Sequence, residues 1–216
     1  YVYSGAKIKE QYQKLANAFK GLDVKIKYAC KANSNINILK LLKQDGSGID
    51  AVSLNEVRLG LKAGFDPQEI LYTPNGVSMA EIEKAVDLGV HINIDNISVL
   101  EQFGHKYQNT VPVCIRINPH VMAGGNSHIQ TGHIDSKFGI SIHQIRHVIR
   151  VVKANNMDIA GLHMHTGSDI VDAEVFTLAA ELLFEVAMNF DNLKYVDLGS
   201  GFKVSYRKDD VTTDID

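Results

Sequence analysis

The stretch Tyr28-Ala29-Cys30-Lys31-Ala32-Asn33-Ser34-Asn35 organises the rest of the chain. The apolar run Val24–Cys30, which contains two lysines, leads into Lys31, and small and polar residues follow. This pattern predicts a strand that presents a lysine at its carboxyl end. An amine there can form a Schiff base with a carbonyl cofactor or substrate, although a lysine at a strand end is more commonly a solvated side chain.

The composition of the 216 residues limits the classes of partner. The chain is 45% hydrophobic and 22% charged, with a net charge of −3, and no apolar run reaches the roughly 20 residues of a membrane helix. We therefore expect neither nucleic acid nor a membrane as partner. Tyr1–Gly5 lack the features of a signal peptide. Cys30 and Cys114 lie in apolar runs, which indicates buried thiols in a reducing, cytoplasmic setting and no metal site.

Strand-like and helical patterns alternate along the chain. The expected strands are Val24–Cys30, Ile49–Val52, Ile70–Tyr72, His91–Ile94, Val111–Ile117, Ile159–His163 and Leu193–Leu198. The expected helices are Ser4–Phe19, Asn35–Lys43, Leu54–Ala63, Met79–Leu88, Ser98–Lys106, Ser141–Asn155 and Ala173–Asn189. Such alternation predicts parallel strands joined by crossover helices.

The spacing of the strands favours a barrel. The first five strands start near residues 26, 49, 70, 91 and 112, about 21 to 23 residues apart, which suits the repeated unit of a TIM-type (β/α)8 barrel. A doubly wound open sheet is the alternative, but no G-x-G-x-x-G turn follows the first strand. The pattern contains seven strands, and Lys203–Asp216 turn polar and acidic without an eighth. We expect residues 1–216 to form one α/β barrel domain that is truncated before its last strand.

Polar residues follow the predicted strands, at the end where such barrels carry their active sites. They are Lys31, Asn33, Asp50, Ser53, Thr73, Asn75, Asp95, Arg116, Asn118, His163, His165 and the turn Gly199-Ser200-Gly201. The longest irregular stretch, Asn118–Gly139, follows the fifth strand at the same end, and a loop of this length is usually functional or disordered. The sequence therefore predicts a polar mouth that fits a cofactor.

Two segments at this end have more than one interpretation. The backbone N–H groups of Gly199-Ser200-Gly201 can approach a phosphate, or the glycines only satisfy a turn with positive φ. His163 and His165 face one side of their strand. Three interpretations are open. The two histidines could form a zinc pair, although no third ligand with local spacing is evident. His163 could instead be a packed core histidine, or an imidazole could stack on a flat cofactor while Ser168 donates to its phosphate.

Taken together, these motifs resemble the fold-type III pyridoxal-phosphate enzymes, the superfamily of alanine racemase and the ornithine and diaminopimelate decarboxylases. In the family's order they are Tyr28–Asn33; Gly48–Ser53 with Glu56 and Gly60; Ile115–Pro119; Thr131-Gly132 with Ser136–Ile140; Gly161–Ser168; and Asp197–Phe202. Within the superfamily the chain is most similar to the diaminopimelate decarboxylase family, and the resemblance covers nearly its whole length.

The resemblance implies pyridoxal 5′-phosphate as the cofactor. The expected cofactor-binding residues are Lys31, Asp50, Arg116, His165, Ser168, Gly199, Ser200 and Gly201, of which Lys31 and His165 are also the expected catalytic residues. Lys31 would bind the cofactor covalently and transfer protons, His165 would stack on its ring, and Ser168 with the glycine turn would bind its phosphate. Asp50 and Arg116 would line the floor near Lys31 and the ring. The implied reaction is decarboxylation of meso-2,6-diaminopimelate to L-lysine, the last step of lysine biosynthesis.

The chain departs from the family pattern in several places. Ser200 replaces the middle glycine of a Gly-Gly-Gly turn, and Gly125-Asn126 stand where the family often has Thr-His. The Glu-Pro-Gly-Arg motif and the C-terminal β-domain are missing, which predicts the front part of a two-domain, homodimeric enzyme, inactive as this fragment. The alternatives are a decarboxylase for ornithine, arginine or carboxynorspermidine, and a non-catalytic pyridoxal-phosphate carrier. The segment His165–Ser168 argues against alanine racemase.

Overall fold

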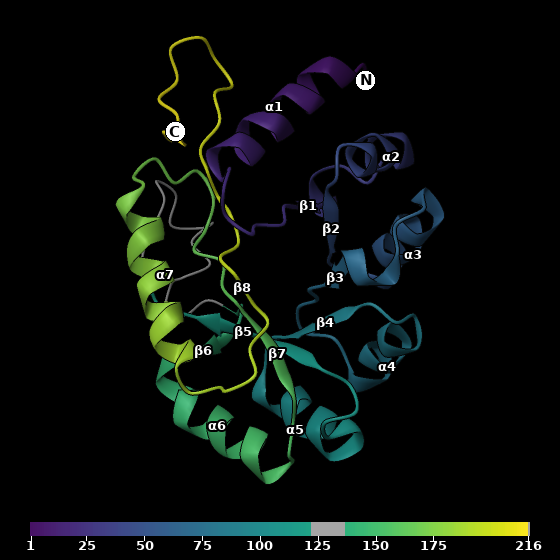
Figure 1. Cartoon of the computed structure of the whole chain (residues 1–216), viewed down its shortest axis with the longest axis vertical. Helices are drawn as coiled ribbons and strands as arrows, with labels where there is room; N and C mark the ends of the chain where they lie inside the picture. Colours follow the sequence, from purple (N-terminus) through teal and green to yellow (C-terminus); the bar gives the residue numbers. More distant parts are fainter. Residues whose placement is uncertain (122–136, 216) are drawn as a thin grey trace. The chain divides into compact units, whose positions relative to one another are not determined.

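The computed structural model describes residues 1–121 and 137–215, which divide into two compact units, Tyr1–Ile92 and Asn93–Asp214. Each unit consists of parallel strands with helices between them (Figure 1). The predicted motif residues Thr131-Gly132 and Ser136, and the variant pair Gly125-Asn126, lie outside the described residues. None of the helices that are described is long and apolar enough to cross a membrane.

The first unit alternates helices and short strands. Its elements are α1 (Gly5–Ala18), β1 (Lys27–Ala29), α2 (Ile36–Gln44), β2 (Gly48–Ala51), α3 (Leu54–Ala63), β3 (Ile70–Tyr72), α4 (Met79–Asp87) and the start of β4 (His91–Ile94), with 3-10 helices at Cys30–Ala32 and Pro67–Glu69. β1 pairs with β2, β2 with β3 and β3 with β4, all in parallel. The register places Ala29 beside Asp50 and Asp50 beside Leu71.

Polar side chains fix where the helices of this unit begin. In α1, α2 and α3 a backbone N–H of the first turn donates a hydrogen bond to the side chain that precedes the helix. The acceptors are Ser4 Oγ at 3.3 Å in α1, Asn35 Oδ1 at 2.9 Å in α2 and Ser53 Oγ at 3.3 Å in α3. Such caps satisfy N–H groups that have no partner within the helix. The end of α3 is set by Gly64, whose φ of +98° is readily adopted by glycine.

Gly60 allows α3 to lie directly on the strands. A Cβ atom at Gly60 would be 2.2 Å from Ile49 Cδ1 and 3.2 Å from Ile70 Cδ1, so a larger residue would separate α3 from β2 and β3. Ile49 is fully buried beneath the helix. Because successive side chains of a strand point to opposite faces, Asp50 points to the face away from α3.

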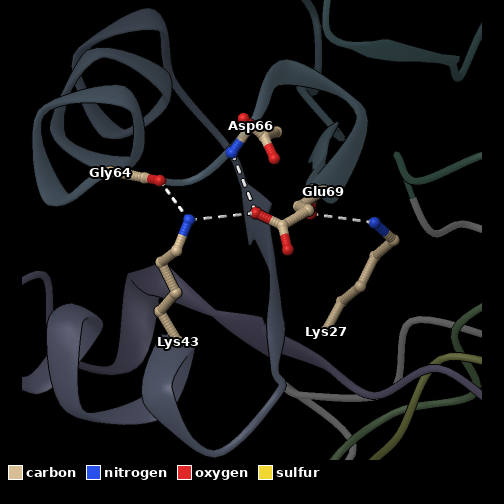
Figure 2. A network of polar contacts seen from close by, with 5 residues as sticks. All are labelled: Lys27, Lys43, Gly64, Asp66 and Glu69. Atoms are coloured by element: carbon tan, nitrogen blue, oxygen red, sulfur yellow. Dashed lines mark hydrogen bonds and ion pairs between the residues drawn. The ribbon is translucent and has the colours of Figure 1, made fainter.

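Glu69 joins three segments at the amino-terminal end of these strands (Figure 2). Its backbone carbonyl accepts a hydrogen bond from Lys27 Nζ at 2.9 Å. Its carboxylate accepts one from the N–H of Asp66 at 2.8 Å and lies 3.5 Å from Lys43 Nζ, which also donates to the carbonyl of Gly64. This network ties the beginnings of β1 and β3 to α2.

The second unit continues the same pattern. It contains the end of β4, α5 (Ile97–Tyr107), β5 (Val113–Asn118), β6 (Ile140–Ser141), a 3-10 helix (Ile142–Gln144), α6 (Ile145–Ala154), β7 (Ile159–His163), α7 (Glu174–Ala187) and β8 (Tyr195–Asp197). β5 pairs in parallel with β4, β6 and β7, and β7 pairs with β8.

The two faces of this second sheet differ in chemistry. One face carries apolar residues in register, Ile94, Ile115, Leu162 and Val196. On the other face the neighbouring rows are Asn93, Cys114, Gly161 and Tyr195, followed by Arg116, His163 and Asp197. Asn93, Arg116 and His163 are buried, so this polar face lies inside the protein. Buried polar groups need hydrogen-bond partners. The residues of this face are therefore candidates for a binding site as well as for packing.

The predicted helices and strands agree with the structure except at the ends of several elements and at β6. The strands Ile70–Tyr72, His91–Ile94 and Ile159–His163 and the helix Leu54–Ala63 have the predicted bounds. The strand predicted over Val24–Cys30 is wrong in length, because β1 pairs with β2 only over Lys27–Ala29. Lys31 therefore lies in the following 3-10 helix and does not end the strand. The count of seven strands misses β6, whose two residues are too few to give a periodic pattern.

Candidate functional site

Lys31 lies in a closed turn directly after β1. The Tyr28 hydroxyl donates to the backbone carbonyl of Asn33 at 3.0 Å, and the Asn33 side chain accepts from the N–H of Asn35 at 3.0 Å. Between these bonds the chain makes the 3-10 helix that carries Lys31. The Lys31 side chain is exposed, and within the described part of the chain its amine makes no hydrogen bond or ion pair. The fold thus fixes the backbone and leaves a primary amine uncommitted.

Asp50 belongs to the same end of the first unit. It is half-buried in β2, beside Ala29 in the register, and lies on the face away from α3. The neighbouring thiol of Cys30 is 1% exposed. Burial, and to a lesser degree the Glu56 and Asp50 carboxylates, raises the pKa of Cys30 to about 12. The residue before Lys31 is therefore a neutral, unreactive thiol at physiological pH.

Arg116 and His163 are neighbours on the polar face of the second unit. Arg116 in β5 is paired in register with His163 in β7, and both are buried. The Asn93 side-chain amide lies 2.7 Å from His163 Nδ1 and donates to it when that nitrogen is unprotonated. These contacts confirm the interpretation of His163 as a packed histidine. Among the described residues, no group of three His, Cys, Asp or Glu side chains could hold a metal ion.

His165 lies just beyond the end of β7, against the turn that follows β8. It is half-buried, and a Cβ atom at Gly199 would be 3.1 Å from its Nδ1 and 2.4 Å from the carbonyl oxygen of Met164. The backbone of this turn is held by hydrogen bonds from Met164 N to Asp197 O at 3.0 Å and from Gly199 N to Asp197 Oδ1 at 2.8 Å. Only a residue without a side chain fits at position 199.

Gly201 makes an equally close approach to the loop after β7. Its φ is +135°, and a Cβ atom there would be 2.2 Å from the carbonyl oxygen of Gly167. Ile170 N donates to Gly201 O at 3.0 Å, and Lys203 N donates to Ile170 O at 3.2 Å. The two loops are therefore joined backbone to backbone, and the positive φ values of the sequence-predicted glycine turn coincide with the contact.

Ser168 and Ser200 are exposed on these joined loops. Within the described residues neither hydroxyl makes a hydrogen bond. Together with the turn Gly199–Gly201, they place hydroxyl and backbone groups on the exposed side of these loops. Such a surface suits an anion with several oxygens, such as a phosphate.

The structure thus places the eight predicted residues in two groups. Lys31 and Asp50 lie in the first unit, at the carboxyl ends of β1 and β2. Arg116, His165, Ser168, Gly199, Ser200 and Gly201 lie in the second unit, at or beyond the carboxyl ends of β5, β7 and β8. The first group offers an exposed primary amine, and the second offers a half-buried imidazole and the glycine turn.

Some residues of the polar face are not evident from the sequence motifs. Asn93 pairs with His163, and Phe138 lies against Arg116 with its ring centroid 4.9 Å from the guanidinium carbon. The alternation of His91, Asn93 and Asp95 is a signal that could have identified Asn93. Phe138 belongs to the motif Ser136–Ile140, but the motif does not reveal its contact with Arg116, because that contact depends on how Phe138 packs against β5.

Comparison with known proteins gives consistent matches. A family model described as the pyridoxal binding domain of pyridoxal-dependent decarboxylases matches residues 5–216. A diaminopimelate decarboxylase of Methanothermobacter thermautotrophicus is 38% identical over all of this chain and 52% of its own length.

Solved structures of decarboxylases are also similar to this chain. The diaminopimelate decarboxylase of Helicobacter pylori complexed with L-lysine has a TM-score of 0.85 at 32% identity, over 99% of this chain and 56% of that one. A lysine/ornithine decarboxylase of Vibrio vulnificus complexed with cadaverine has a TM-score of 0.78 at 25% identity, over 96% and 52%. The chain spans about half the length of the curated relatives that it matches.

Proposed function

Because the chain belongs to the pyridoxal-dependent decarboxylases, we propose that the whole protein is a pyridoxal-phosphate-dependent lyase that converts meso-2,6-diaminopimelate to L-lysine and CO2. The resemblance predicted from the motifs is confirmed by the family match, and the predicted barrel fold by the solved structures. The choice of diaminopimelate rests on relatives of that name that match over the whole chain.

The observation that carries the proposal is the uncommitted amine of Lys31 on a braced turn. Lys27 and Lys43 of the same unit use their amines in the network around Glu69. Lys31 makes no such bond within the described residues, and it differs from the other exposed lysines of the unit in its place directly after the carboxyl end of β1. Its amine is suited to bind the aldehyde carbon of the cofactor.

The second unit offers the remaining parts of a cofactor site. The turn Gly199–Gly201 and the hydroxyls of Ser168 and Ser200 would receive the phosphate, because backbone N–H groups and hydroxyls are its natural donors. His165 is half-buried beside Gly199 and would cover one face of the flat ring. Arg116 and Asp50 would line the floor near the ring, as the resemblance implies.

When bound, the cofactor supplies the sink for the electron pair left on the substrate carbon as CO2 departs. The chain's own residues orient the reactants and move protons. Lys31 Nζ, once released from the cofactor, would carry the proton that replaces the carboxylate. His165 would exclude water from one face of the ring, since its imidazole packs against the backbone of Gly199.

Three further parts of the proposal concern the whole protein. Residues 1–216 would form one incomplete barrel domain of it. The protein would act as a homodimer, as the resemblance implies. It would reside in the cytoplasm, where Cys30 and Cys114, which are buried and form no disulfide, stay reduced. Size measurement of the full-length protein in solution tests the dimer directly.

The activity is tested with the full-length protein, reconstituted with pyridoxal 5′-phosphate and supplied with single amino acids. We expect release of CO2 from meso-diaminopimelate and formation of L-lysine, with Lys31→Ala as the inactive control. The Vibrio neighbour makes a lysine/ornithine decarboxylase the second candidate. Release of CO2 from ornithine, lysine or arginine, with none from diaminopimelate, would replace the first proposal by the second. Cofactor binding without CO2 release from any of them would favour a carrier.

A further inference from the structure

Phe138 places its ring against the guanidinium group of Arg116. The Arg116 Cζ atom lies 4.9 Å from the ring centroid, within cation–π distance. Arg116 is 7% exposed and Phe138 is half-buried, so little water competes with the contact. Lys137 Nζ also lies 5.2 Å from this ring, but Lys137 is an exposed side chain. Since cation–π attraction grows with desolvation, the contact with Arg116 is the stronger of the two.

The ring is held in place by the strand that carries Arg116. Gly139 has a φ of +77°, and a Cβ atom there would be 3.0 Å from Asn118 N and 3.3 Å from Arg116 O. One residue later, Ile140 of β6 pairs in register with Ile117 of β5. The segment Phe138–Ile140 is thus pressed onto β5, and the ring has a fixed position relative to Arg116.

From this geometry we propose that Phe138 is a positioning residue, which holds the Arg116 guanidinium in the orientation that binds the cofactor. The inference rests on the proposed function, because it assumes that Arg116 contacts the cofactor. A long arginine side chain has many rotamers, and a flat ring selects those in which the planar guanidinium stacks on it. Phe138 itself need not touch the cofactor.

The experiment measures the affinity of the full-length apoprotein for pyridoxal 5′-phosphate by absorbance titration. Phe138→Leu keeps an apolar side chain but removes the ring, and we expect it to weaken binding about tenfold, the size of one desolvated cation–π contact. Phe138→Tyr keeps the ring and should stay within about twofold of the parent. Phe138→Met replaces the leucine variant if that protein does not fold.

Tyr107 provides a matched control. It is also a half-buried aromatic residue with a cation at its ring, Lys106 Nζ at 5.6 Å, but it lies in α5. Tyr107→Leu should leave cofactor affinity unchanged. The thermal midpoint of each apoprotein, measured in parallel, separates lost stability from lost positioning.

A double-mutant cycle with Arg116→Met decides whether Phe138 acts through Arg116. If it does, Phe138→Leu should weaken binding no further once Arg116 is replaced. The inference is overturned if Phe138→Leu binds like the parent, if Phe138→Tyr loses as much as Phe138→Leu, or if the loss persists in the Arg116→Met background.

Lys31→Ala separates this inference from the function on which it rests. A parent protein that binds no cofactor, or binds it equally without Lys31, overturns both. Binding that requires Lys31 but ignores Phe138 overturns only the role of Phe138.

Discussion

Two regions of the molecule hold their candidate residues in opposite ways. The β1 turn, Cys30–Asn33, is closed by the hydroxyl of Tyr28, and its lysine extends into solvent. The loop pair, His165–Ile170 with Gly199–Phe202, is joined backbone to backbone at distances that leave no room for a Cβ atom. Under the proposed function, chemistry that needs a mobile amine would thus fall to a side chain, and phosphate binding to a fixed backbone.

The largest expected effect comes from removing the mobile group. Lys31→Ala in the full-length protein should lower decarboxylase activity by about a thousandfold or more, because it removes the amine proposed to bind the cofactor. Its thermal midpoint without cofactor should not change, since the Lys31 amine makes no hydrogen bond or ion pair within the described residues. A large loss of stability would show that the amine has a structural partner and that the β1 turn resembles the loop pair after all.

A substitution in the loop pair should chiefly lower the stability of the fold, in contrast to one at Lys31. Gly201→Ala would place a Cβ atom 2.2 Å from the carbonyl oxygen of Gly167, at a φ of +135°. We expect it to lower the free energy of unfolding by about 3 kcal/mol, from strain and overpacking together. Denaturant titration measures this loss.

Gly64→Ala is the matched control for this change. Gly64 also has a positive φ, +98°, but nothing lies within 4 Å of its missing Cβ. The loss there should be only about 1 kcal/mol, from conformation alone. Equal losses at positions 64 and 201 would contradict the close contact between the loops.

A pH titration examines the thiol inside the β1 turn. Cys30 has a pKa of about 12 in the folded protein because it is buried, whereas an unfolded thiol has one near 8.5. The stability gained from the neutral thiol is full below about pH 8.5 and is lost as the pH rises toward 12. Between pH 8 and pH 10 the parent should therefore lose about 1 to 2 kcal/mol more than Cys30→Ala. Parallel losses in both proteins would mean that the thiol is not shielded.

The smallest effect is expected at the opposite end of β1. Glu69→Ala removes the carboxylate that receives Asp66 N and lies near Lys43, on a side chain that is partly exposed. We expect the free energy of unfolding to fall by about 1 kcal/mol. Cofactor affinity should stay the same, because the β1 turn is braced separately by Tyr28. Weaker cofactor binding in this variant would show that the two ends of the strand are coupled.

Local features explain how much of this could be predicted from the sequence. Neighbouring residues and hydrophobic periodicity account for the caps Ser4, Asn35 and Ser53, for the positive φ of Gly199 and Gly201, and for the bounds of three of the seven predicted strands, while the other four differ at their ends. Contacts between segments that are distant in the sequence cannot be predicted in this way. Phe138 meets Arg116 only because β6 packs on β5, and the place of Lys31 in a 3-10 helix depends on where pairing with β2 ends.

The most direct test of the account is chemical trapping of the cofactor on the full-length protein. The protein is incubated with pyridoxal 5′-phosphate, reduced with borohydride, digested and analysed by mass spectrometry. The account predicts that the added mass lies on the peptide containing Lys31 and disappears from that peptide in Lys31→Ala. A stoichiometric label on another lysine, with Lys31 unmodified, would contradict it.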